Sequence, residues 1–204
     1  LRRQRQMCIR DRVATIIGTQ LGIFILTSQI DNESAGIYSV SLGLVNMLLV
    51  IPNSIKIVFQ SRINNILQSN KNIENQTLII FRQTLIAMIF CSIIFIALGK
   101  YLILFLYGLV YIPSYEPLLI LLFYIIFRSV GSSLATYFAL EKKFWFASKA
   151  IIITAIINLL LSILFINKFG IYGVAFATSF SWFIWFIINI KAVSYTHLRA
   201  HETR

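Results

Sequence analysis

The sequence has little charge, little proline and almost no cysteine. Only 12% of its 204 residues are charged, against about 25% in soluble globular domains, while 58% are hydrophobic. A chain with half the usual charge cannot cover a folded surface with solvated groups, which argues against a water-soluble enzyme. Three prolines and nine glycines also argue against a fibrous or disordered chain.

Histidine is absent from the interior of the chain, residues 13–192, and Cys91 is the one cysteine there. The interior also contains no HExxH motif, no CxxC motif and no glycine-rich phosphate loop. Its acids lie in loops or at the ends of apolar runs: Asp31, Glu33, Glu74, Glu116 and Glu141. These absences argue against a paired-carboxylate hydrolase and against an intramembrane proton carrier. We therefore expect no enzyme, no catalytic residue, no metal site and no cofactor.

The two ends differ from the interior in composition. Residues 1–12 and 193–204 are strongly polar, and both resemble translated sequencing-adapter read-through. They hold seven of the 18 Lys and Arg residues and two of the seven acids. No aromatic or basic helix continues the Arg-rich start, so we expect no nucleic-acid partner. The chain is thus interpreted as two non-native-looking ends, 1–12 and 193–204, around a membrane unit at 13–192.

Long apolar runs fill the interior. A bilayer core of about 30 Å needs about 20 apolar residues in a helix. Backbone polar groups cannot stay unpaired in hydrocarbon, and the runs do not alternate as barrel strands do, so we expect helices. The sequence predicts an all-α membrane protein with about six transmembrane helices, at residues 13–30, 34–55, 77–98, 117–140, 144–166 and 169–190. Pro52 and Lys56 are expected to end the second of them.

Residues 99–116 are apolar but too short to cross a membrane alone, and Gly99, Gly108 and Pro113 interrupt them. We interpret them as a short interfacial helix followed by a turn, with their tyrosines at headgroup depth. The alternative is that the third transmembrane helix runs on to about Leu109.

Lys and Arg gather in alternate loops. The loops after the second and fourth spans carry three basic residues each, whereas the other loops carry none or one. Because basic loops stay in the cytoplasm, this pattern places both ends and the two basic loops inside the cell. Lys56, Arg62 and Lys71 are expected to be surface charges facing anionic lipid.

Arg128 lies at the centre of the fourth span, where a cation costs about 2.5–3.5 kcal/mol on insertion scales. It either meets a phosphate-bearing substrate, for which a guanidinium fork has the right geometry, or packs against neighbouring carbonyls. Ser132 and Thr136 follow at one-turn intervals and favour a polar face on this helix. Gln20 and Asn158 are expected to be buried amides, which either join helices or line a hydrophilic cavity. These five residues are the candidate substrate-binding set.

Three segments resemble the polysaccharide-export flippases of the multidrug/oligosaccharidyl-lipid/polysaccharide superfamily. They are AGIYSVSLGLVNMLLVIPNSIKIVFQSRI at 35–63, LFLYGLVYIPSYEPLLILL at 104–122 and NLLLSILFINKFGIYGVAFATSFSW at 158–182. The family usually has a proline near Gln60–Arg62, which this chain lacks.

In that family two six-helix lobes face each other across a central cavity, so the resemblance implies that this chain is one lobe, the C-terminal one. The implied activity is the transfer of undecaprenyl-pyrophosphate-linked oligosaccharide across the bacterial inner membrane, for O-antigen, capsule or exopolysaccharide synthesis. The implied partners are membrane lipid, that lipid-linked substrate and the missing N-terminal lobe. Two alternatives remain: a multidrug or cation exporter of the same superfamily, which predicts intramembrane acids, and a membrane-embedded polysaccharide polymerase, which predicts a long catalytic loop.

Overall fold

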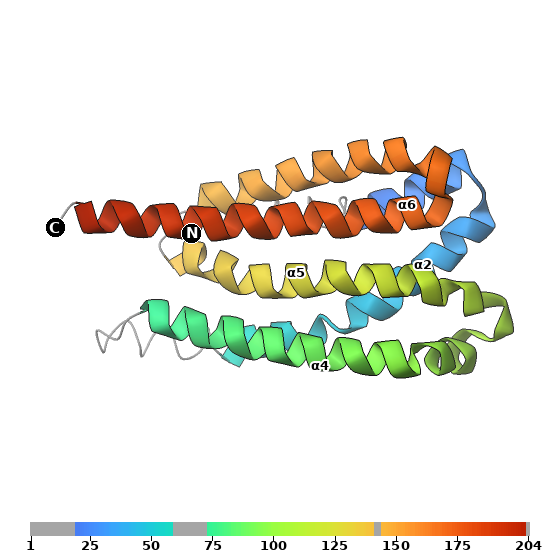
Figure 1. Cartoon of the computed structure of the whole chain (residues 1–204), viewed down its shortest axis with the longest axis horizontal. Helices are drawn as coiled ribbons and strands as arrows, with labels where there is room; N and C mark the ends of the chain where they lie inside the picture. Colours follow the sequence, from blue (N-terminus) through green and yellow to red (C-terminus); the bar gives the residue numbers. More distant parts are fainter. Residues whose placement is uncertain (1–18, 59–72, 141–143, 203–204) are drawn as a thin grey trace.

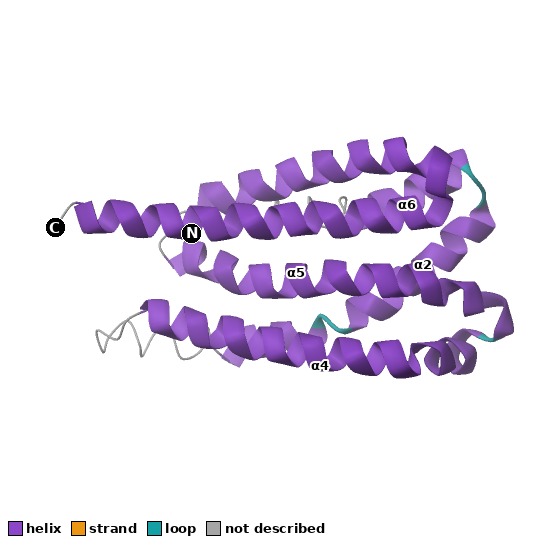
Figure 2. Cartoon of the chain, viewed as in Figure 1, coloured by secondary structure: helices purple, strands orange, loops and turns teal. Residues whose placement is uncertain are grey.

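The computed structural model describes residues 19–58, 73–140 and 144–202, with side chains at 19–58, 77–133 and 149–192. Helices dominate these ranges, which contain no strand (Figure 2). In chain order they are a helix at 19–29, α2 (Asn32–Met47), a helical stretch at 50–58, α4 (Ile73–Tyr107), the 3-10 helix η1 (Leu109–Ser114), α5 (Tyr115–Leu140) and α6 (Phe144–Glu202).

Four stretches of the described residues are long and apolar enough to cross a membrane: Asn32–Val58, Thr77–Tyr107, Leu109–Ser133 and Lys149–Ala192. The predicted all-helical class is therefore confirmed for the described residues, and four stretches have the length and composition of membrane spans, whereas about six were predicted. Helices suit a membrane because a helix pairs its own backbone N–H and C=O groups, whereas hydrocarbon offers these groups no hydrogen-bond partner.

α4 shows how the bundle treats its outer surface. Its exposed side chains are almost all large and apolar, among them Leu78, Ile86, Phe90, Ile93 and Phe105. In water such a surface would be far larger than the apolar patches that soluble monomers carry. Exposing these side chains to lipid tails carries no hydrophobic penalty, so the apolar outer surface of α4 fits a protein embedded in a bilayer.

Three chain reversals lie at one end of the bundle (Figure 1, right). They are at Asp31, at Gly108 and at Gly170, and the two glycines have positive φ angles of 84° and 54°. Only glycine adopts such backbone conformations at low cost. A hydrogen bond links α6 to α5 at this end, because Tyr172, just after Gly170, donates to the carboxylate of Glu116 in the first turn of α5.

α6 consists of two helical segments that meet at Gly170, where the backbone leaves helical geometry. Figure 1 shows the segments, orange and red, running side by side in opposite directions. Gly173 allows the close approach, since a Cβ at this position would lie 2.6 Å from the backbone oxygen of Phe165. A side chain there would force the two segments apart.

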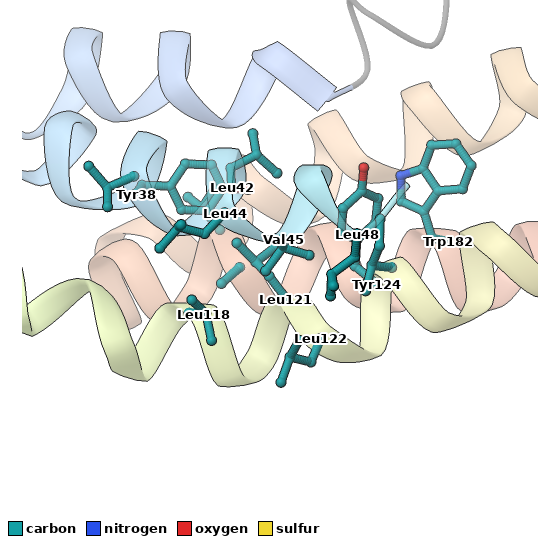
Figure 3. Close-up of a cluster of buried hydrophobic side chains, with 14 of the residues drawn as sticks. Tyr38, Leu42, Leu44, Val45, Leu48, Leu118, Leu121, Leu122, Tyr124 and Trp182 are labelled. Carbon is teal, nitrogen blue, oxygen red and sulfur yellow. The ribbon is translucent and has the colours of Figure 1, made fainter. Parts of the chain in front are cut away.

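The core lies between α2, α5 and the second segment of α6 (Figure 3). Tyr38, Leu42 and Val45 of α2 pack against Leu118, Leu121 and Tyr124 of α5, and all of them are buried. The Tyr38 hydroxyl forms a 3.1 Å hydrogen bond with Thr178 in α6. Leu and Val side chains thus fill the space, and this bond pairs two buried hydroxyls across helices. The hydroxyls of Ser92, Ser114 and Ser129 are buried without a partner in the described structure.

The interpretation of residues 99–116 as an interfacial helix is wrong for residues 99–107. These residues extend α4 to Tyr107, close to the alternative end at Leu109, and the turn begins only at Gly108. Gly99 is a packing position and does not break the helix. A Cβ there would lie 3.4 Å from the Tyr115 ring, whose hydroxyl donates a 2.7 Å hydrogen bond to the Ile96 carbonyl.

The second predicted helix was also expected to end too early. It continues past Pro52 to Val58, with a distortion at residues 48–49. Pro52 has no N–H to donate to Leu48, so the Leu48 carbonyl accepts a 3.2 Å bond from Ile51 instead. At the other end of the chain, α6 stays helical through Glu202, across the boundary expected at residue 192.

Candidate functional site

Arg128 lies about halfway along α5, about 20 Å from its first residue at 1.5 Å per residue. Its Nη1 donates a 3.3 Å hydrogen bond to Asn46 Oδ1 in α2 and a second bond to the hydroxyl of Tyr124, one turn earlier in α5. Tyr124 in turn donates a 3.0 Å hydrogen bond to Asn46 Oδ1. The guanidinium is therefore held by neutral oxygens of two helices.

Two aromatic rings also hold the Arg128 side chain. Its Cζ lies 5.1 Å from the ring centroid of Trp182 and 5.6 Å from that of Tyr124. The two rings are side by side, with centroids 5.7 Å apart in an edge-to-face arrangement (Figure 3). The negative faces of aromatic rings stabilise a cation in a desolvated place, which makes Arg128 tolerable at this depth.

A cavity of about 240 Å³ opens beside Arg128. Its lining comes from the second transmembrane stretch, from α5 and from both segments of α6. The described lining residues are Leu49, Pro52, Asn53, Lys56, Arg128, Ser132, Ile151, Trp182 and Trp185. The cavity lies on the side of Arg128 toward the end of α5, the side that the loop charges predict to face the cytoplasm.

The charge of the cavity has one sign. Lys56 and Arg128 both line it, and its described lining includes no carboxylate. Lysine supplies a compact ammonium group and arginine a planar fork of donors, so the pair favours an anionic ligand with several oxygens. The described residues contain no cluster of His, Cys, Asp or Glu that could hold a metal ion.

Trp185 adds an uncharged donor. The residue is only 4% exposed, lines the cavity and has a buried Nε1–H that meets no acceptor in the described structure. Gly131 of α5 leaves room for its indole, because a Cβ there would lie 2.4 Å from Trp185 Cζ3. A buried N–H without an acceptor is costly, which makes it a functional candidate.

Ser132 lies one turn after Arg128 and also lines the cavity, as the predicted polar face requires. Its hydroxyl donates a 2.7 Å hydrogen bond to the Ser129 carbonyl. Thr136 belongs to α5 one turn further on, and its side chain lies outside the described part of the structure.

Gln20 and Asn158 are not among the described lining residues of this cavity. The expected burial of Gln20 is wrong, because its side chain is exposed. The buried positions of this helix, at 19, 22, 25 and 26, follow 3–4 spacing, and residue 20 falls on the opposite face. Asn158 is buried as expected, and its Oδ1 accepts a 3.1 Å hydrogen bond from Ser162 of the same helix.

Lys56 was expected to face lipid, and the structure instead places it in the cavity with Arg128. The signal was present in the spacing of Leu49, Pro52, Asn53 and Lys56, which share one helix face. It was lost because the helix was expected to end at residue 55 and Lys56 was assigned to the following loop. Trp182, Trp185 and Asn46 were missed because no local pattern relates them to Arg128.

In comparisons with protein families, with curated proteins and with solved structures, nothing matches this chain.

Proposed function

We propose that this chain is one lobe of a flippase for undecaprenyl-pyrophosphate-linked oligosaccharide in the bacterial inner membrane. The lobe has about six transmembrane helices, with residues 13–30 as the first and the two segments of α6 as the last two. The second lobe faces the cavity, and the two lobes alternate access to it from either side of the membrane. The substrate serves the synthesis of O-antigen, capsule or exopolysaccharide.

The cavity beside Arg128 is the observation that carries this proposal. It brings Lys56, near the end of its transmembrane stretch, together with Arg128, which lies midway along α5 where a cation is costly. A diphosphate anion matches this pair, and the Arg128 fork can bind its oxygens with two bonds. The cavity lies on the predicted cytoplasmic side, where a lipid-linked sugar made inside the cell would load.

The resemblance of residues 35–63, 104–122 and 158–182 to polysaccharide-export flippases supports the same assignment. The multidrug or cation exporter is less favoured, since a cationic cargo would be repelled by Lys56 and Arg128. A polymerase is less favoured because its catalysis would need acids or histidines.

The test uses the complete two-lobe protein from the intact gene, reconstituted in proteoliposomes with lipid-linked oligosaccharide in one leaflet. Transfer is measured as loss of access to a membrane-impermeant sugar-modifying enzyme. Replacing Arg128 or Lys56 with glutamine removes a charge-assisted contact and should slow transfer about tenfold or more.

Arg82→Gln is the matched control, because Arg82 is exposed on α4 and is not part of the described cavity lining. It should leave transfer unchanged. Wild-type transfer by the double variant Arg128→Gln/Lys56→Gln would show that the cavity is not the substrate site. An intact gene without a second lobe would remove the proposal altogether.

A further inference from the structure

We infer that the indole N–H of Trp185 is the third donor of an oxyanion subsite that Arg128 and Lys56 complete. The subsite binds phosphoryl oxygens, and the inference rests on the proposed function. The inference gives Trp185 a role in ligand recognition, although its burial and its large apolar ring are typical of a core residue.

The first observation is the state of the Trp185 nitrogen. Its Nε1 is fully buried and meets no hydrogen-bond acceptor in the described structure. Tryptophan N–H groups normally find a partner when buried, because a donor removed from water without one loses its hydration with nothing in exchange. The residue also lines the cavity, and because its Nε1 is covered in the structure, a ligand there reaches the N–H only after the side chains over it move aside.

The second observation is that the surroundings hold the indole in a fixed place. Its benzene edge packs onto Gly131, where any side chain would collide with it. Its ring contacts Trp182 at 5.1 Å between centroids, and Trp182 in turn lies over the Arg128 guanidinium. Trp182 therefore contacts both the Arg128 guanidinium and the Trp185 ring that carries the N–H.

The third observation is the chemistry of the donor set. An ammonium, a guanidinium and an indole N–H all donate, and none accepts. A ligand that satisfies all three donors must be an anion with several acceptor oxygens. Phosphate and diphosphate groups meet this requirement, whether they are part of a lipid headgroup or free in solution.

The three donors come from three separate parts of the chain: the helical residues 50–58, α5 and the second segment of α6. One diphosphate that engages all three would bridge these helices. Binding would thus restrain the cavity-lining side of the lobe in one arrangement, with the ligand as the common contact.

The test measures binding to the full chain in lipid nanodiscs. Undecaprenyl pyrophosphate in the bilayer and inorganic pyrophosphate in the buffer are the two anionic probes, and undecaprenol is the neutral control. Trp185→Phe keeps an aromatic ring and removes only the N–H donor with the outer part of the ring. It should weaken binding of the anionic probe about tenfold, the ratio expected from one hydrogen bond to a charged group.

A second measurement does not depend on how well the variant binds. With ¹⁵N in the indole nitrogens, the Trp185 N–H resonance, assigned by its loss in Trp185→Phe, should shift downfield when the anionic probe binds. Undecaprenol should not shift it. If only undecaprenyl pyrophosphate produces the shift, the ligand is the lipid headgroup; if inorganic pyrophosphate also produces it, the subsite reads the phosphate alone. Both results support the inference.

The inference and the proposed function can fail separately. Equal probe binding by wild type and Trp185→Phe, with a loss in Arg128→Gln and an unmoved indole resonance, overturns the role of Trp185 alone. Trp185-dependent binding without any lipid transfer by the intact protein overturns the flippase alone. Absence of binding of either anionic probe to the wild-type chain overturns the subsite.

Discussion

The hydroxyl of Tyr124 in α5 donates a 3.0 Å hydrogen bond to Asn46 Oδ1 in α2, and Arg128 donates to both oxygens. The two helices are thus joined at the point where the guanidinium enters the bundle. In this largely apolar place, the oxygens and the aromatic rings around Arg128 replace water as partners of its guanidinium.

Tyr124→Phe tests the role of this hydrogen bond in positioning. The variant should lose about 1 kcal/mol of stability, since the bond to Asn46 and the bond from Arg128 both disappear, while Asn46 Oδ1 keeps its bond from Arg128. It should also weaken pyrophosphate binding, because Arg128 is left with fewer restraints. Unfolding in mixed detergent micelles gives the first quantity, and nanodisc binding gives the second.

Tyr38→Phe is the control for that comparison. It removes the buried 3.1 Å hydrogen bond between Tyr38 and Thr178. Neither residue is part of the described cavity lining. A similar loss of stability with unchanged binding is expected. Equal weakening of binding in both variants would contradict a specific role for Tyr124.

Gly131→Ala tests the packing of Trp185 on α5. The new Cβ would lie 2.4 Å from Trp185 Cζ3, so the indole or the helix must move, and overpacking of this kind costs about 1–3 kcal/mol. Gly43→Ala in α2 is the matched helical control, because nothing lies within 4 Å of its Cβ position. The control should stabilise the protein by about 0.5–1 kcal/mol. A neutral Gly131→Ala would show that the Trp185 ring is free to shift.

Gly173→Ala tests the reversal inside α6. Its Cβ would collide with the backbone oxygen of Phe165, which cannot rotate away as a side chain can, so a loss of about 1–3 kcal/mol is expected. Gly36→Ala is the control, since the nearest atom to its Cβ position lies 4.0 Å away. Equal stability of the two variants would contradict the close approach of the two α6 segments.

The arrangement of the reversals predicts which loops share a side of the membrane. With Cys8 and Cys91 changed to serine, single cysteines at Glu33 and Lys168 should react with an impermeant maleimide added to intact cells. A cysteine at Lys142 should react only after permeabilisation, because basic loops stay inside. Labelling of Lys142→Cys in intact cells would reverse the orientation and place the cavity on the opposite side.

Asp31 caps α2, where its Oδ1 accepts a 2.6 Å hydrogen bond from the Ser34 backbone N–H. This bond lowers the pKa of the Asp31 carboxyl below its ordinary value of 3.8. Because the folded state holds its proton less tightly, the cap stabilises the protein fully above that ordinary value. The stabilisation is lost as the pH falls through the lowered pKa.

The measurement for Asp31 is the unfolding midpoint between neutral pH and about pH 3. The difference between wild type and Asp31→Ala should shrink as the pH falls. Asn is also a good N-cap and does not titrate, so Asp31→Asn should remain close to wild type at neutral pH. A difference between wild type and Asp31→Ala that does not change with pH would contradict a contribution from the charged carboxylate.

The sequence predicted the structure best where the residues of a single segment determine where a helix begins or ends. The fourth span, expected at 117–140, matches α5 within two residues, and the break expected at Asp31 is the N-cap of α2. It failed where glycine and proline were taken as signs that a helix ends. Gly99 and Pro52 both lie inside helices, because the first accepts the Tyr115 ring and the second leaves only a local distortion.

By itself, the sequence determined that this chain forms long apolar helices with a guanidinium halfway along one of them. Apolar composition is sufficient for that, because a helix satisfies its own backbone wherever water is absent. Only the tertiary structure decided that Lys56, Trp182 and Trp185 meet Arg128 around one cavity. These residues lie up to 129 positions apart in the sequence. Their meeting depends on how closely helices approach, which Gly131 and Gly173 control through the side chains they lack.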